Sequence, residues 1–240
     1  MTTANNSSYV PFLKDADLEK EVRALLEKAK AIQNKLDDEK MHKNVIDPFG
    51  SLIEQAGFDI DYNEWFKNER TRQMQKSLAN AIGEFHQKII GHIDGWQDLG
   101  TGKVVDLVHE DKKIIAEVKN KHNTVTASKL MDVYDILEGQ VMPKNGLYRG
   151  YTSYLVQIIP AAPERYDDTF TPSNTKTGTK KPENEKIRRI DGYSFYALAS
   201  GYPDAYRMIF ATLPKVIQKC NPSAQISTSE INALFKRAYG

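Results

Sequence analysis

The spacing of apolar residues predicts helices through most of the first ninety positions. Over Leu18–Leu36, apolar residues recur every three or four positions, as in a helix with one buried stripe, and Asp15 is a suitable N-cap for it. A short helical piece is expected at residues 62–67. A stronger helix is predicted over residues 72–90 by a second stripe, which consists of Met74, Leu78, Ile82, Phe85 and Ile89.

The periodicity changes after residue 90, where Gly95, Gly100 and Gly102 punctuate the chain. The pattern then predicts strands at residues 103–109, 113–120 and 151–160, and helices at residues 126–140, 203–219 and 229–238. Residues 172–185 contain almost no apolar side chain, so we expect a mobile loop there.

This order of elements predicts an α/β protein with a mixed central β-sheet flanked by helices. A helical N-terminal region and C-terminal helices are added to that core. We expect three regions: an N-terminal helical region (1–75), the core that carries the chemistry (76–160), and a basic loop with C-terminal helices (161–240). The last region is expected to pack with the core as one domain.

Composition narrows the class of protein. Apolar residues make up 40% of the 240, which is enough for a core and too many for a disordered chain. No apolar run approaches the ~18 residues that cross a membrane, and the polar N-terminus lacks the features of a signal peptide. The single cysteine, Cys220, excludes an internal disulfide and a cysteine-rich metal site. We therefore expect a soluble cytoplasmic protein.

Charge is balanced in total but segregated along the chain. The 33 Lys and Arg against 32 Asp and Glu give a net charge of +1, which by itself argues against a nucleic-acid partner. However, residues 14–61 carry twelve acidic against eight basic side chains, whereas residues 171–190 carry six bases against two acids. Solvated faces explain this segregation as well as a nucleic-acid surface does. The net charge therefore decides nothing about the partner.

Candidate catalytic groups lie in the predicted hairpin. With a two-residue loop at Asp111-Lys112, or a four-residue loop at residues 110–113, the register places Asp106 directly opposite Glu117. Lys119 projects from the same face of its strand. Opposed like charges destabilise a sheet unless something compensates them, and a divalent cation such as Mg²⁺ suits hard oxygen ligands. The alternative is an amphipathic hairpin with a solvated charged face.

Several motifs resemble a known family. Asp106 and, after ten intervening residues, Glu117-Val-Lys119 resemble the PD-(D/E)XK nuclease superfamily. Within it, the chain resembles the type II restriction endonucleases that cut GGNCC sites. The matching blocks are Asn44-Val-Ile-Asp-Pro-Phe49, Arg72-Gln-Met-Gln-Lys76, Asn80-Ala-Ile-Gly-Glu-Phe-His-Gln87, Ala116-Glu-Val-Lys-Asn-Lys-His-Asn-Thr124, Asp191-Gly-Tyr-Ser-Phe-Tyr196 and Ser200-Gly-Tyr-Pro-Asp-Ala205.

The resemblance implies a restriction-endonuclease-like core and a homodimer that hydrolyses both strands of a short palindromic DNA site with Mg²⁺. It assigns metal binding to Asp106 and Glu117, and the superfamily's catalytic lysine to Lys119. Val105 stands where the superfamily usually has a proline. Many members also use a glutamate from the preceding helix, which Glu84 matches. The alternative for Glu84 is an ordinary acid on a helix surface.

DNA-binding residues are expected in two places. One set leaves the active strand and comprises Asn120, Lys121, His122, Asn123 and Thr124. The other lies in and after the basic loop and comprises Lys180, Lys181, Arg188, Arg189 and Asp191. Guanine favours bidentate Arg or Lys and cytosine favours Asp or Glu, but exposed loops and internal salt bridges are equally ordinary readings of both sets. Asp94 and Asp98 are fallback metal ligands.

A Mg²⁺-dependent, site-specific deoxyribonuclease is thus the leading hypothesis. Two alternatives stay open: a DNA repair or junction nuclease built on the same core, and a non-catalytic DNA-binding protein whose acidic pair is structural.

Overall fold

The computed structural model describes residues 9–35, 46–100 and 102–240. The chain divides into two compact units, the first joining the residues up to Val22 with residues 83–240, and the second consisting of residues 23–82. The expected division at residues 75 and 160 stays a prediction.

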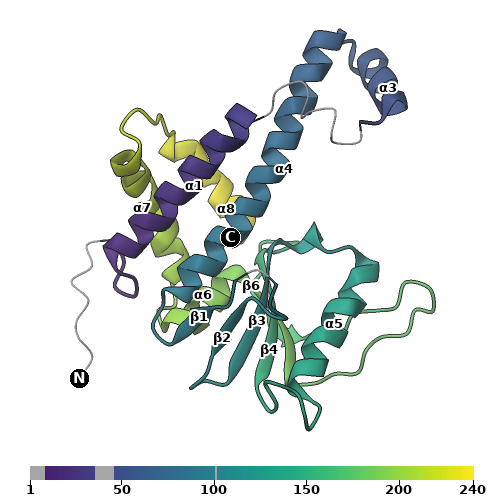
Figure 1. Ribbon diagram of the computed structural model, residues 1–240, viewed down its shortest axis with the longest axis vertical. Helices are drawn as coiled ribbons and strands as arrows, with labels where there is room; N and C mark the ends of the chain where they lie inside the picture. The colour runs from purple at the N-terminus through teal and green to yellow at the C-terminus, as the bar shows by residue number, and fades with distance from the viewer. Residues whose placement is uncertain (1–8, 36–45, 101) are drawn as a thin grey trace. The chain divides into compact units, whose positions relative to one another are not determined.

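A six-stranded mixed sheet is the centre of the first unit (Figure 1). In spatial order its strands are β1 (Trp96–Asp98), β2 (Leu107–His109), β3 (Ile114–Lys121), β4 (Thr152–Ile159), β6 (Ile187–Asp191) and β5 (Asp167–Thr169). The inner strands β3, β4 and β6 run parallel, whereas β1, β2 and β5 pair antiparallel with their neighbours. The predicted mixed sheet flanked by helices is confirmed.

One face of the sheet is partly covered by α5 (Ala127–Val141), which follows the short 3-10 helix η1 (His122–Thr124). Parallel neighbours such as β3 and β4 need a crossover connection, and α5 provides it. The buried core on this face joins Tyr134 and Leu137 of α5 to strand residues, namely Ile115, Leu155 and Ile187. Two residues further along the same face, each of these strands carries a polar side chain: Glu117, Gln157 and Arg189.

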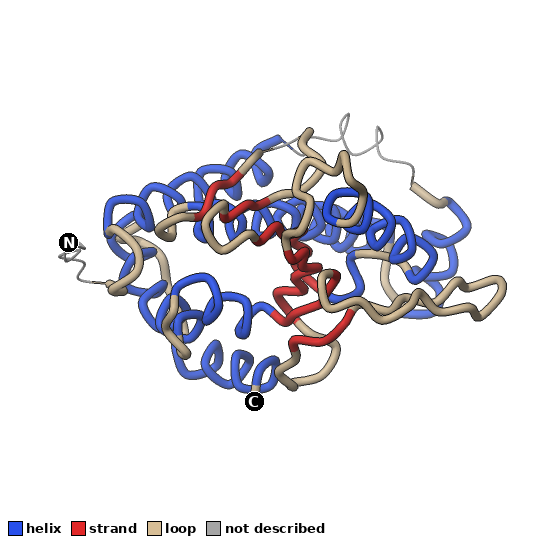
Figure 2. Tube along the Cα trace, turned by 90° about the horizontal axis from the view of Figure 1, so that it is seen from below, coloured by secondary structure: helices blue, strands red, loops and turns tan. Residues whose placement is uncertain are grey.

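The opposite face carries the C-terminal helices. These are α6 (Gly192–Ser200), α7 (Ala205–Cys220) and α8 (Thr228–Tyr239). Phe195 of α6 packs its ring against Tyr154 of β4, with 6.0 Å between centroids. The hydroxyls of Tyr206 and Tyr239 share a buried hydrogen bond of 2.8 Å, which links α7 to α8. Figure 2 shows strands lying between helices on both sides.

The second unit is helical. It contains the later part of α1 (Asp15–Lys35), α3 (Pro48–Phe58) and the first part of α4 (Tyr62–Gly91). Asp47 caps α3 by accepting a hydrogen bond of 3.0 Å from the backbone of Phe49. The Trp65 indole of α4 donates to Glu54 of α3 over 2.9 Å, which ties the two helices together. In the described parts of both units, no helix is long and apolar enough to span a membrane.

Three element predictions need correction. The pieces expected at residues 62–67 and 72–90 form one continuous helix, α4, because Arg72 pairs with Glu69 through two 2.6 Å hydrogen bonds across the polar junction. The strand expected at residues 103–109 begins only at Leu107. The short strands β1, β5 and β6 and the helix α6 were absent from the prediction.

A half-buried histidine gives the first unit a pH dependence that can be measured. His86 of α4 lies among aromatic rings and bonds Tyr196 Oη through its Nδ1 at 2.9 Å. Burial lowers the pKa of His86 to about 4, so the folded state resists its protonation. The stability it contributes is fully present above the ordinary pKa of ~6.5 and is lost as pH falls towards 4, by at most ~1.4 kcal/mol per pH unit.

We therefore expect His86→Asn, whose amide keeps a partner for Tyr196 but cannot be protonated, to flatten the free energy of unfolding between pH 6.5 and 4. Urea unfolding at several pH values measures this slope, with the exposed His122→Asn as the matched control. An unchanged slope in His86→Asn would contradict the burial argument.

Candidate active site

The register of the β2–β3 hairpin decides where its acids lie. Leu107 pairs with Ala116 and His109 with Ile114, so the connection is the four-residue loop, residues 110–113. Lys113 takes a left-handed conformation at the end of this turn, with φ of 52°. The predicted register is confirmed in these pairs, which end at Leu107. Asp106 comes directly before them and lies near enough to Glu117 for its charge to raise the pKa of that carboxyl.

Asp106 lies where the strand pairing ends. Its backbone N–H donates to the Ala116 carbonyl over 3.0 Å, and its carbonyl accepts from Leu99 over 2.9 Å. The Val118 N–H donates to Asp106 Oδ2 over 2.7 Å, so a carboxylate takes the place of a backbone carbonyl as its acceptor. Gln87 of α4 also hydrogen-bonds this carboxylate. The side chain is therefore fixed from two directions before any ligand binds.

Glu117 and Lys119 lie two residues apart on one face of β3 and contact each other. The Lys119 ammonium donates to Glu117 Oε1 over 2.6 Å, and the side chains are 27% and 20% exposed, respectively. Alternation along the strand explains the shared face. Both groups are thus held at the sheet surface and still reach solvent.

The two carboxylates are hard to ionise together. Burial raises the pKa of Asp106, against the opposing effect of the Val118 hydrogen bond and the Lys119 charge. Burial, followed by the charge of Asp106, raises the pKa of Glu117, while Lys119 acts to lower it. Lys119 therefore offsets this repulsion only in part. A cation between the two oxygens would favour the ionised forms.

This donor set fits a hard divalent cation that is completed by other ligands. Within the described ranges, no group of three or more His, Cys, Asp or Glu side chains is arranged to hold a metal. Mg²⁺ is commonly held by only one or two carboxylates, together with water and substrate phosphate. Two carboxylates with raised pKa values match that kind of site better than a closed protein cage.

Glu84 lies near this region without completing a three-acid cluster in the described part of the chain. It is half-buried on α4 beside Gly83, where an added Cβ would lie 3.6 Å from Asn120 Cβ at the end of β3. Of the fallback ligands, Asp98 ends β1 and its charge contributes to the raised pKa of Asp106, whereas Asp94 lies exposed in the preceding turn. The metal and catalytic roles of these residues stay predictions.

The residues that follow the active strand form a compact turn. Asn120 and Lys121 end β3, and His122, Asn123 and Thr124 form η1. The Lys121 N–H donates to Thr124 Oγ1 over 3.1 Å, which closes the turn. All but the half-buried Asn120 are exposed. Their contact with DNA stays a prediction.

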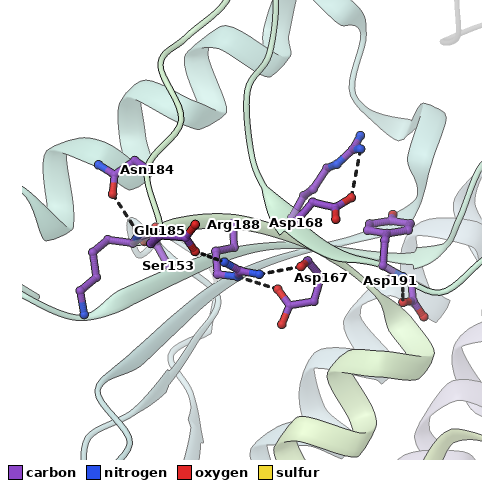
Figure 3. A network of polar contacts seen from close by, with 10 residues as sticks. Ser153, Asp167, Asp168, Asn184, Glu185, Arg188 and Asp191 are labelled. Carbon is purple, nitrogen blue, oxygen red and sulfur yellow. Dashed lines mark hydrogen bonds and ion pairs between the residues drawn. The ribbon is translucent and has the colours of Figure 1, made fainter.

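The members of the second predicted DNA-binding set that lie on β6 have different surroundings (Figure 3). Arg188 forms two salt bridges within the chain, in which its guanidinium bonds Asp167 at 2.7 Å and Glu185 at 2.5 Å. Arg189 points to the other face, is 51% exposed and lies 3.3 Å from Asp168. For Arg188 the internal salt bridge is the observed arrangement, whereas Arg189 stays a candidate for DNA contact.

Asp191 lies where β6 ends and α6 begins. It is fully buried, and both of its oxygens are used. Oδ1 accepts from Ser194 at 3.0 Å and caps α6, and Oδ2 accepts from the Tyr166 N–H at 2.9 Å. Asp191 therefore ties β6, α6 and the segment before β5 together, and its contact with DNA stays a prediction.

The basic loop contains a hydrogen-bonded arm, residues 172–181. An isolated bridge pairs Ser173 with Lys180, and the Lys181 N–H donates to the Pro172 carbonyl over 2.9 Å. Lys181 is anchored on α5, since its ammonium lies 2.5 Å from Asp135 and over the Tyr134 ring. Lys180 is exposed. The two neighbouring lysines thus have different surroundings.

Sequence reasoning missed two polar groups beside Lys119. Gln157 lies next to Lys119 in the β3–β4 register, and the Tyr166 hydroxyl donates to Gln157 Oε1 over 2.7 Å. Gln157 is a polar residue within an otherwise apolar run, Leu155–Ile159, and that interruption was the available signal. Tyr166 had none, because its place depends on β5 and β6.

Comparisons with known proteins agree with this geometry. Residues 10–221 match the family described as Eco47II restriction endonuclease. The chain is 47% identical over 211 residues to the type II restriction enzyme Eco47II of Escherichia coli, covering 88% of this chain and 87% of that one. It is 25% identical over 236 residues to the type II restriction enzyme Sau96I of Staphylococcus aureus, covering 97% and 89%.

The raised pKa values of Asp106 and Glu117 indicate that their ionised forms destabilise the metal-free protein at neutral pH. A carboxyl whose pKa is higher in the folded than in the unfolded protein stabilises the fold at low pH, where it is protonated. This stabilisation is lost as pH rises through the folded-state pKa. Asp106→Asn should therefore unfold at a higher temperature than the wild type at pH 7, by about 2–4 °C, and the difference should shrink at pH 4.

Thermal unfolding in EDTA at both pH values measures this, with the exposed turn variant Asp111→Asn as control. A destabilised Asp106→Asn at pH 7 would show instead that the ionised carboxylate stabilises the fold.

Proposed function

The chain belongs to the Eco47II restriction endonuclease family and is a site-specific type II restriction endonuclease, a hydrolase of DNA; on that premise we propose that it cuts both strands of GGNCC as a Mg²⁺-dependent homodimer. The observation that carries the chemistry is the proximity of Asp106 and Glu117 beside Lys119. The GGNCC site is supported by the sequence resemblance.

Asp106 and Glu117 are the proposed holders of the cation. A bound Mg²⁺ supplies charge neutralisation at the phosphoryl group and promotes ionisation of a water. The chain's own contribution is to hold the two carboxylates at the open end of the sheet face. The Val118 N–H fixes Asp106 and Lys119 fixes Glu117, so little reorganisation is needed when the phosphate arrives.

Lys119 has a second proposed role. Its ammonium is 27% exposed and has further N–H donors beyond the one that Glu117 accepts. It is therefore able to orient the attacking water or to stabilise negative charge on the phosphate. Glu84 is kept as a proposed auxiliary acid from α4.

DNA affinity is proposed to come from exposed basic and amide side chains around this site. The turn of Lys121–Thr124, the exposed Arg189 and the arm residue Lys180 are the candidates. Contacts of Lys and Arg with phosphates make binding weaken as salt rises. A homodimer is proposed because a palindrome presents two equivalent cleavage sites related by a twofold axis.

Plasmid cleavage tests the function as a whole. Plasmid is incubated with the protein and Mg²⁺, with EDTA as the control, and the ends are mapped. Discrete double-strand fragments with ends at GGNCC support the proposal. Structure-dependent nicking would instead support a repair or junction nuclease, and intact plasmid with retained binding would support a non-catalytic DNA-binding protein.

Loss of either active-site charge should stop cleavage without abolishing binding. We expect Glu117→Ala and Lys119→Ala each to lower the cleavage rate by at least ~10²-fold, while gel-shift affinity for the duplex stays substantial. Glu110→Ala, which removes an acid from the turn at the other end of the hairpin, is the matched control. Normal cutting by either active-site variant would contradict the assignment.

The two neighbouring lysines of the arm should differ in their salt dependence. Lys180→Ala should lower the slope of log affinity against log salt by about 0.9, the value for one phosphate contact. Lys181→Ala should lower it by less than half as much, because Asp135 and Glu138 already pair that charge.

The two slopes are compared for duplex binding in a Lys119→Ala background, in which we expect cleavage to be lost. Equal changes in slope for Lys180→Ala and Lys181→Ala would contradict this division.

A further inference from the structure

Gln157 of β4 is a lateral neighbour of Lys119. The register pairs Lys119 with Gln157 and Gln157 with Asp191, so the three side chains lie in one row on the same face of the sheet. Neighbouring strands are about 5 Å apart. Gln157 is half-buried, and on its strand it comes two residues after Leu155, which packs in the core with α5.

The orientation of the Gln157 amide is determined by its partners. The His122 carbonyl can only accept a hydrogen bond, and it lies 3.4 Å from Gln157 Nε2. The amide nitrogen must therefore face His122, which leaves Oε1 to accept from the Tyr166 hydroxyl at 2.7 Å. Burial raises the pKa of Tyr166 to about 12, so this hydroxyl remains a donor.

Tyr166 is itself fixed. Its backbone N–H donates to the buried Asp191 over 2.9 Å, and the Arg189 guanidinium lies 5.3 Å from the centre of its ring. A hydrogen-bonded chain thus runs from Asp191 through Tyr166 to Gln157. It ends at the turn that follows the active strand.

The amide that results has donor capacity to spare. A glutamine NH₂ group carries two hydrogens, and the one contact with His122 is long. A neutral donor held beside Lys119, on the same face as Glu117, is suited to a phosphate oxygen. It would add direction to the contact without adding charge to the site.

We propose that Gln157 is a phosphate-binding residue of this endonuclease, whose amide donates to a DNA backbone phosphate beside the scissile one, and that Tyr166 is the positioning residue that orients it. The inference rests on the proposed cleavage of duplex DNA and adds a contact that the paired acids and lysine do not supply.

Two substitutions separate phosphate contact from a structural role. Gln157→Glu keeps the acceptor for Tyr166 and the shape of the side chain, but it replaces the donor with a charge that repels phosphate. We expect kcat/KM to fall about 100-fold, mainly through KM, with Tm within a few degrees of the wild type. Gln225→Glu, the same change at an exposed position outside the sheet, should cleave normally.

Gln157→Leu is then combined with duplexes that carry a single neutral methylphosphonate at each successive backbone position. The wild type should lose about tenfold in kcat/KM at one position where Gln157→Leu loses nothing further, because the contact is already absent. Tyr166→Phe should reduce the methylphosphonate penalty at that same position.

Penalties that simply add in Gln157→Leu at every position, or normal cleavage by Gln157→Glu, would overturn this inference alone. A wild type that cleaves no duplex would overturn the proposed function and this inference with it.

Discussion

The hydrogen bond from the Val118 N–H to the Asp106 carboxylate is the interaction on which the candidate site depends. It ends the pairing of the hairpin by exchanging a backbone acceptor for a side chain, and it directs that side chain towards Glu117. Two acids held in this way repel each other, and burial raises the pKa of both. Lys119 compensates only part of the repulsion, so the fold keeps an arrangement that favours a cation.

The division of one sheet face explains how such a costly site is tolerated. Ile115, Leu155 and Ile187 bury their side chains under α5 and provide stabilisation through apolar contact. On the same face, the residues two positions further along these strands are polar, namely Glu117, Gln157 and Arg189. Asp191 then joins β6 to α6 and to the Tyr166 segment, so the polar end is held by buried hydrogen bonds rather than by packing.

Local features of the sequence predicted the site better than they predicted its surroundings. The proximity of Asp106 and Glu117 follows from loop length and alternation within one hairpin, which are local. Arg188 and Asp191 were proposed for DNA because they follow the basic loop, and their internal partners, Asp167 and Tyr166, could not be foreseen because they lie 21 and 25 residues earlier in the chain. No periodicity indicates that β5 will pair with β6. The three-residue strands are likewise too short to give a pattern, and their existence depends on the sheet that they join.

Cation binding by the Asp106–Glu117 pair is the most direct test of this account. Calorimetric titration of Mg²⁺ into the complex of Lys119→Ala with a GGNCC duplex measures it where cleavage is blocked. Adding Asp106→Asn to that protein should weaken Mg²⁺ binding at least about tenfold, since one of two carboxylate ligands loses its charge. Equal Mg²⁺ affinity with and without Asp106→Asn would contradict the central claim.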